Sequence, residues 1–198
     1  MTSPLQLVAT NLRKTFNRRV IFDGVSITLA PGKTLLITGR NGSGKSTLVK
    51  ILAGVLSPSG GSVSESGSPG LVSPYLQLYD EFSAVENLRL AMSLRGLPYD
   101  RVRGEDLLRR VGLAARKDDP VRTYSSGMKQ RAKYAFALMH TPVVLLLDEP
   151  MSNLDADGIA IVRSIMADHR GTGILVVATN DLTDIDRYDE RIDLNAAR

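Results

Sequence analysis

The sequence contains no cysteine, which excludes disulfide frameworks, thiolate metal sites and cysteine nucleophiles. It also lacks long apolar runs: the longest, residues 143–147 and 174–178, are far shorter than the roughly 20 residues that a membrane-spanning helix needs. The opening residues, MTSPLQLVATN, have no basic stretch followed by an apolar core, so we expect no secretory signal. The expected location is therefore cytoplasmic.

Neither sign of charge dominates the chain. Lysine and arginine number 25 against 21 aspartates and glutamates, which gives a net charge of +4. Basic pairs such as Arg18-Arg19 and Arg109-Arg110 could face a nucleic acid, an anionic membrane or water, and water is the commonest case. With 198 residues, of which 43% are hydrophobic and 23% charged, the chain has the size and composition of one packed globular domain.

The pattern of short apolar runs predicts an α/β fold. The first forty residues alternate polar and apolar positions around turn signals at residues 17–18 and 31–32, which favours an antiparallel β segment. A buried strand at residues 35–38 then leads through glycines into a helical pattern at residues 46–56. A serine- and glycine-rich stretch follows, and we expect it to form turns around a brief strand at residues 62–65.

The middle third of the sequence is predicted to be helical. Ser83 and Glu86 form a capping box that begins a helix running to about Arg95, and a second helix spans residues 101–111 with Gly112 as its stop. Strand character returns at residues 143–147, 174–178 and 191–194, with an amphipathic helix at residues 156–169. Strand, helix and strand in this order predict a parallel sheet with crossovers.

One motif predicts a phosphate site. The segment GRNGSGKST, residues 39–47, matches the pattern G-x-x-x-x-G-K-[ST] between a strand and a helix. The glycines let backbone amides turn toward a polyphosphate, Lys45 bridges the outer phosphates, and Ser46 offers a hydroxyl to a magnesium ion. The alternative is a plain glycine-rich turn. The candidate ATP-binding residues of this loop are Gly39, Asn41, Gly42, Ser43, Gly44, Lys45, Ser46 and Thr47.

Two carboxylates follow the buried strand at residues 143–147. Open parallel sheets bind their ligands at the carboxyl ends of the strands, so Asp148 is predicted to hold magnesium. Glu149, one residue on, is placed to take a proton from an attacking water as the general base of hydrolysis. Carboxylates at strand ends are often only structural, and the lysine loop is what favours a catalytic role here.

The segment YSSGMKQR, residues 124–131, resembles the signature of the ABC family. The family pattern, leucine-serine-glycine-glycine-glutamine, falls on residues 124–128, where Ser125 and Gly127 match and Met128 replaces the glutamine. Ser125 is also expected to cap a helix that runs to about His140. The resemblance covers essentially the whole chain, with the phosphate loop, helical insertion, signature and carboxylate strand in family order. Two further segments match, residues 152–155 and 178–181.

This resemblance implies a P-loop ATPase core with an inserted helical subdomain. The core is expected at residues 1–78 and 124–198 and the subdomain at residues 79–123. In the family the signature meets the γ-phosphate of ATP held by the other protomer, so the resemblance implies a head-to-tail dimer, with itself or a related ATPase, in which Ser125 and Gly127 complete the partner's site. Phe16 lies where the family places an adenine-stacking aromatic; a core aromatic is the alternative.

Two further positions, 74 and 180, depart from the family pattern. Asn180 stands where the family has its switch histidine; it can hydrogen-bond a γ-phosphate but cannot carry a proton's charge near neutral pH. Pro74 falls at the position of the magnesium-binding glutamine, and Gln77 lies three residues later as the candidate metal ligand.

The resemblance thus implies an ATP- and magnesium-dependent subunit of an ABC transporter, held at the inner face of the cell membrane by integral membrane subunits on separate chains. At this size it looks most like the ATPases of exporters, including the haem-exporter type, with no nucleic-acid partner expected. The alternative is a soluble ABC ATPase acting on ribosomes or nucleic acid. A P-loop kinase is a third interpretation, which the signature argues against.

Overall fold

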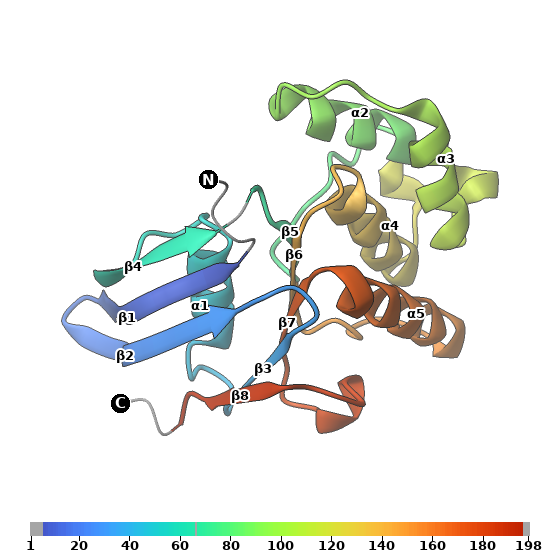
Figure 1. The fold of residues 1–198 in the computed structure, drawn as a ribbon. Helices are drawn as coiled ribbons and strands as arrows, with labels where there is room; N and C mark the ends of the chain where they lie inside the picture. The colour runs from blue at the N-terminus through green and yellow to red at the C-terminus, as the bar shows by residue number, and fades with distance from the viewer. Residues whose placement is uncertain (1–5, 66, 196–198) are drawn as a thin grey trace.

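Two β-sheets form the framework of the computed structural model, which describes residues 6–65 and 67–195 (Figure 1). The larger sheet is parallel, with the strand order β5-β6-β7-β3-β8, and the smaller is antiparallel, with the order β2-β1-β4. The predicted α/β class with an antiparallel start is therefore confirmed. The ends of the predicted domain, residues 1–5 and 196–198, lie outside the described residues.

The antiparallel sheet arises from a hairpin near the N-terminus. Strands β1 (Leu7–Phe16) and β2 (Arg19–Leu29) pair around a tight turn in which Asn17 and Arg18 have φ of 47° and 68°. Strand β4 (Gly60–Glu65) pairs with the other edge of β1, so the predicted brief strand at residues 62–65 is confirmed.

The parallel sheet is buried on both faces. Strands β3 (Thr34–Thr38), β6 (Val144–Asp148) and β7 (Ile174–Ala178) are buried at every position. Alternate residues enter two different cores, because successive side chains of a strand point to opposite faces. The sheet is completed by the edge strands β5 (Gly70–Val72) and β8 (Glu190–Asp193).

Helix α1 (Lys45–Leu52) packs in the core that the two sheets share. The sequence predicted that this helix would reach residue 56, and that was wrong by four residues. The chain leaves the helix at Ala53, and the next residue, Gly54, has a φ of 69°, in the left-handed region that ends helices.

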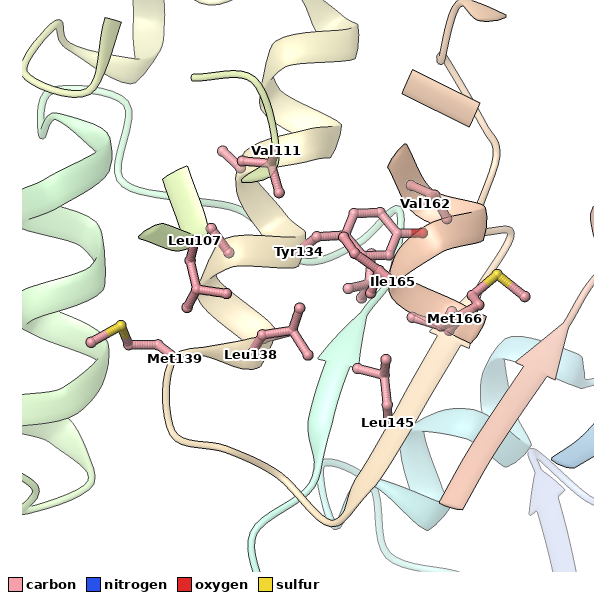
Figure 2. Close-up of a cluster of buried hydrophobic side chains, with 14 of the residues drawn as sticks. Leu107, Val111, Tyr134, Leu138, Met139, Leu145, Val162, Ile165 and Met166 are labelled. Atoms are coloured by element: carbon pink, nitrogen blue, oxygen red, sulfur yellow. The ribbon is translucent and has the colours of Figure 1, made fainter. Parts of the chain in front are cut away.

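The other face of the parallel sheet carries α4 (Ser126–Leu138) and α5 (Ala156–Thr172), the second of which runs three residues beyond its predicted end. Figure 2 shows Tyr134 of α4 directed toward Val162 and Ile165 of α5, with Leu145 of β6 beside them. Tyr134 is fully buried, and its hydroxyl donates a hydrogen bond to the Pro150 carbonyl at 2.9 Å.

Helices α2 (Ala84–Leu94) and α3 (Arg101–Arg110) lie in the predicted helical region and pack on α4 (Figure 1). The capping box is confirmed: the Ser83 hydroxyl accepts from the Glu86 amide, and the Glu86 carboxylate accepts from the Ser83 amide. Gly112, with a φ of 69°, follows α3 as predicted. None of the helices in the described residues combines the length and apolar character needed to cross a bilayer.

Candidate nucleotide site

The glycine-rich loop at residues 39–44 connects β3 to α1 and needs unusual backbone conformations. Gly39, Gly42 and Gly44 all have positive φ. At Gly44, with φ of 107°, a Cβ atom would lie 2.5 Å from Cγ2 of Ile21 on β2. Both the backbone and the contact with the hairpin therefore require glycine at this position.

A cleft of about 500 Å³ opens between this loop and the antiparallel sheet. The side chain of Phe16 is 45% exposed and lines this cleft, so the alternative of a buried core aromatic is excluded. The structure brings most of the predicted site residues to this one cleft. Its lining comprises Phe16, Ile21, Asn41, Gly42, Gly44, Lys45, Ser46, Thr47, Pro74, Tyr75 and Glu149.

Lys45 is the centre of the polar contacts in the cleft. Its side chain is almost buried, and its Nζ donates to the Gly39 carbonyl at 2.9 Å and to Oδ1 of Asn180 at 2.6 Å. Its Nζ also lies 3.8 Å from Oε1 of Glu149. The amide of Asn180 in turn donates to Oδ1 of Asn41. The structure therefore links the lysine of the loop, the residue at the family's histidine position and the candidate base in one network.

Glu149 is held in a strained conformation directly after β6. Its φ is 50°, in the left-handed region, and its amide donates to the Ala178 carbonyl at 2.8 Å. The next carbonyl, that of Pro150, accepts from the buried Tyr134. Burial raises the pKa of the Glu149 carboxyl, Lys45 opposes this rise, and the neighbouring Asp148 adds to it. A base with a raised pKa is better suited to accept a proton.

Asp148 is fully buried at the end of β6. Its Oδ2 accepts from the Ser73 hydroxyl at 3.2 Å, whereas Oδ1 has no hydrogen-bond partner among the described residues. A buried carboxylate oxygen without a partner is costly unless something else satisfies it. A magnesium ion suits this site, because Mg²⁺ in phosphate-transfer sites uses one or two carboxylates together with substrate phosphates.

No group of three or more histidine, aspartate or glutamate side chains that could hold a metal is found within residues 6–65 and 67–195. Two of the predicted magnesium ligands lie in this part of the structure: Ser46 lines the cleft, and Asp148, which is buried and outside the cleft lining, directly precedes Glu149, which lines it.

Gln77, the other predicted metal ligand, lies elsewhere. It is exposed and lines a neighbouring groove of about 240 Å³ instead of the cleft that holds Lys45. The groove is lined by Pro74, Leu76, Gln77, Leu78, Asp80, Val121, Lys129 and Lys133. Pro74 lines both hollows, and Tyr75 lines the cleft. The structure therefore does not bring Gln77 together with the other predicted ligands.

Ser125 and Gly127 begin α4, away from the residues that line the cleft. The Ser125 hydroxyl accepts from the Met128 amide at 3.2 Å, so its predicted helix cap is confirmed. Gly127 packs closely on residues 152–155: a Cβ there would lie 3.1 Å from the Asn153 carbonyl oxygen. The exposed start of α4 and the cleft are separate features of one chain.

Sequence reasoning missed several residues around the site. Ser73 contacts Asp148, and Tyr75 forms part of the cleft wall. Thr179 donates to Asp184 at 2.6 Å and lies within 3.5 Å of Glu149. Thr179 follows β7 as Asp148 ends β6, and this strand-end position could have singled it out. No comparable signal marks Ser73, because β5, the strand that precedes it, has only three residues.

Comparisons with known proteins identify the same family that the motifs at this site resemble. The family model described as "ABC transporter" matches residues 22–152. The chain is 34% identical over 197 residues to the cytochrome c biogenesis ATP-binding export protein CcmA of Methylococcus capsulatus, covering 90% of this chain and 92% of that protein.

Two further similarities extend this agreement. The lantibiotic transport ATP-binding protein SrtF of Streptococcus pyogenes is 32% identical over 181 residues, covering 87% of this chain and 78% of that protein. A solved structure described as an ATP binding subunit of an ABC transporter superposes with a TM-score of 0.82 at 26% identity, covering 92% of this chain and 82% of that chain.

Proposed function

Since this chain belongs to the ABC transporter family and is an ATP-binding, ATP-hydrolysing transporter subunit, we propose that it powers export. In this proposal, two ATPase chains close on ATP and reopen on hydrolysis, and membrane subunits on separate chains convert this cycle into transport. The direction rests on relatives whose names specify export or lantibiotic transport. The ATPase would lie at the inner face of the cell membrane through those subunits.

The observation that carries the proposal is the convergence of three groups around the end of β6, beside the cleft. Lys45, the free oxygen of Asp148 and the raised pKa of Glu149 supply a phosphate contact, a metal ligand and a base at one end of the parallel sheet. We assign Glu149 as the general base and Asn180 as the contact that senses the γ-phosphate. Asp148 and Ser46 would hold magnesium, which would offset charge on the phosphates, and Gln77 would join them only if its loop moved.

ATP binding would use the whole loop and the hairpin. The loop at residues 39–44 and the start of α1 would bind the phosphates, together with Ser43, Ser46 and Thr47, because a helix N-terminus favours anions. Phe16, exposed on the cleft wall, would stack on the adenine.

Ser125 and Gly127 would complete the site of a second copy or of a related ATPase. Ser125 is exposed, Gly127 is half-buried, and neither lines its own chain's cleft, which favours this arrangement. The helical subdomain, proposed at residues 79–123, contributes Asp80 and Val121 to the groove beside Gln77. This groove would receive a segment of the membrane subunit. We propose no nucleic-acid partner, since the similar proteins described above are transport proteins.

The test is affinity purification of a tagged Glu149→Gln chain from detergent-solubilised cells with ATP and magnesium. Removing the base should trap the ATP-bound dimer, and a polytopic membrane protein should co-purify with it. The matched control carries Lys45→Ala as well and should lose the ATP-dependent dimer. Recovery of only ribosomal or DNA-bound material would overturn the transporter proposal, and ATP hydrolysis by Glu149→Gln at the parent rate would remove Glu149 as the base.

A further inference from the structure

The contact between Ser73 and Asp148 is one that the proposed function does not use. Ser73 follows β5 and is 1% exposed, and Asp148 is fully buried beside it. The Ser73 hydroxyl donates to Oδ2 of Asp148 at 3.2 Å, whereas Oδ1 has no hydrogen-bond partner within residues 6–65 and 67–195. Ser73 therefore fixes which carboxylate oxygen is available to a metal.

The same serine also fixes the beginning of the following loop. Its hydroxyl oxygen lies 3.4 Å from the Tyr75 amide, which donates to it. Lys133 on α4 donates to the Ser73 carbonyl at 3.1 Å and lies 3.5 Å from the Pro74 carbonyl. The loop is thus held to the metal carboxylate on one side and to α4 on the other.

This loop separates the nucleotide cleft from the neighbouring groove. Tyr75 lines the cleft, Leu76 and Gln77 line the groove, and Pro74 lines both. A change in the position of Asp148 would reach Tyr75 through two hydrogen bonds that share the Ser73 hydroxyl. Pro74 has neither a backbone amide proton nor a polar side chain, so it cannot supply such a contact itself.

We propose that Ser73 is a positioning residue that orients Asp148 for magnesium and links the metal to the loop at residues 74–77. This inference rests on the proposed ATP site. In this chain the Ser73 hydroxyl links the metal carboxylate to Tyr75 on the cleft wall, and Lys133, which lines the groove, holds the same loop through the Ser73 carbonyl. Outer-shell partners of this kind orient metal ligands and affect metal affinity.

The chain contains no tryptophan, so Tyr75→Trp places a single fluorescent reporter on the cleft wall. The reporter chain also carries Glu149→Gln, which prevents hydrolysis. Emission is measured first with ATP and a chelator and then during titration with Mg²⁺. The two readouts are the half-saturating Mg²⁺ concentration and the size of the metal-dependent change in emission.

Ser73→Ala should raise the half-saturating Mg²⁺ concentration roughly 10-fold, as expected for removing an outer-shell partner of a metal ligand. It should also reduce the metal-dependent emission change, while the response to ATP with chelator remains. Ser73→Thr, which keeps the hydroxyl, should restore both readouts. The matched control is Thr34→Val, which removes a buried hydroxyl that has no hydrogen-bond partner in the described part of the chain.

The outcomes separate this inference from the proposed function. If the reporter chain with Ser73 intact responds to neither ATP nor Mg²⁺, the proposed ATP site fails. If it responds and Ser73→Ala titrates like Thr34→Val, the role of Ser73 is overturned. Should Ser73→Ala fail to fold, Lys133→Met decides: it should halve the metal-dependent emission change with little effect on half-saturation, and an unchanged emission response would overturn the link.

Discussion

The phosphate loop and the signature segment each begin a helix, but they leave the first amides of that helix in different states. At α1 the N-cap is Gly44, which makes no side-chain cap, and Lys45 beside it is buried in a polar network. At α4 the N-cap is Ser125, whose hydroxyl already occupies the Met128 amide, and the surrounding surface is exposed.

This difference indicates how the starts of α1 and α4 would share one nucleotide. Unsatisfied amides at a helix start attract anions, so the α1 end is built to take phosphates from solution. At the α4 end Ser125 occupies the Met128 amide, and this end lies outside the lining of its own chain's cleft, so it would meet a phosphate only when another chain carries one to it.

Mixing two inactive variants tests whether the phosphate loop of one chain and the signature segment of another act on the same nucleotide. Lys45→Ala and Ser125→Arg should each lower ATP hydrolysis by about 100-fold, as expected for removing a group that contacts the reacting phosphates. In the proposed head-to-tail arrangement, however, a mixed dimer would contain one intact loop facing one intact signature. Hydrolysis should therefore reappear when the two variants are mixed, in a colorimetric phosphate assay.

The control for this mixture pairs Lys45→Ala with the double variant Lys45→Ala/Ser125→Arg, which leaves no intact site in any dimer. If the first mixture is as inactive as this control under conditions that allow subunit exchange, the two regions do not share a nucleotide.

Asn180→His tests whether Asn180, which contacts Lys45 of the phosphate loop, takes part in turnover. Asn180 accepts a hydrogen bond from Lys45 and cannot titrate, whereas a histidine there would gain or lose a proton near neutral pH. We expect kcat to change several-fold and to acquire a new inflection between about pH 6 and 7, while ATP binding is retained. Superimposable pH profiles of the variant and the parent would show that the residue takes no part in turnover.

Ser125→Ala tests whether Ser125 of the signature segment contributes to hydrolysis in addition to capping α4. Loss of an N-cap costs about 1 kcal/mol of stability, and Asp100, which caps α3 by accepting from the Arg103 amide, gives a matched loss elsewhere. Both Ser125→Ala and Asp100→Ala should unfold at slightly lower denaturant concentrations. Only Ser125→Ala should reduce hydrolysis, by a few-fold; equal rates in the two variants would leave Ser125 as a helix cap alone.

His169 lies in neither region and should affect only stability. Burial lowers the pKa of its imidazole, so the folded chain resists protonation more than the unfolded chain, whose pKa is near 6.5. Stability should therefore fall as the pH decreases below that value. His169→Gln should weaken this decline in urea midpoints measured from pH 7 to pH 5, and an unaltered slope would contradict the prediction.

The sequence predicted what depends on local chemistry. The capping box at Ser83, the cap at Ser125 and the stop at Gly112 are each set by residues within a few positions of one another. The buried strands were evident from unbroken apolar runs, because both faces of the sheet are covered. The phosphate loop was evident because its glycines and lysine are contiguous.

Contacts between distant segments could not be predicted in the same way. Ser73 and Asp148 are 75 positions apart, and only the pairing of β5 with β6 brings them together. The positive φ of Glu149 depends on how residues 149–150 are fixed by β7 and by Tyr134. Gln77 was a candidate metal ligand because it lies three residues after the position of the family's glutamine, but the loop after β5 directs it to the neighbouring groove.

The close approach of Ile21 to Gly44 limits how this protein can change over generations. Any mutation of Gly44 adds a Cβ that collides with Ile21 and must also keep a φ of 107°. Shortening Ile21 first would remove this collision, but Cδ1 of Phe22 would still lie 3.3 Å from the added Cβ and the backbone strain would persist, so a change at position 21 does not make position 44 acceptable to another residue. Substitution by smaller side chains is therefore open to position 21 during evolution, whereas position 44 is restricted to glycine.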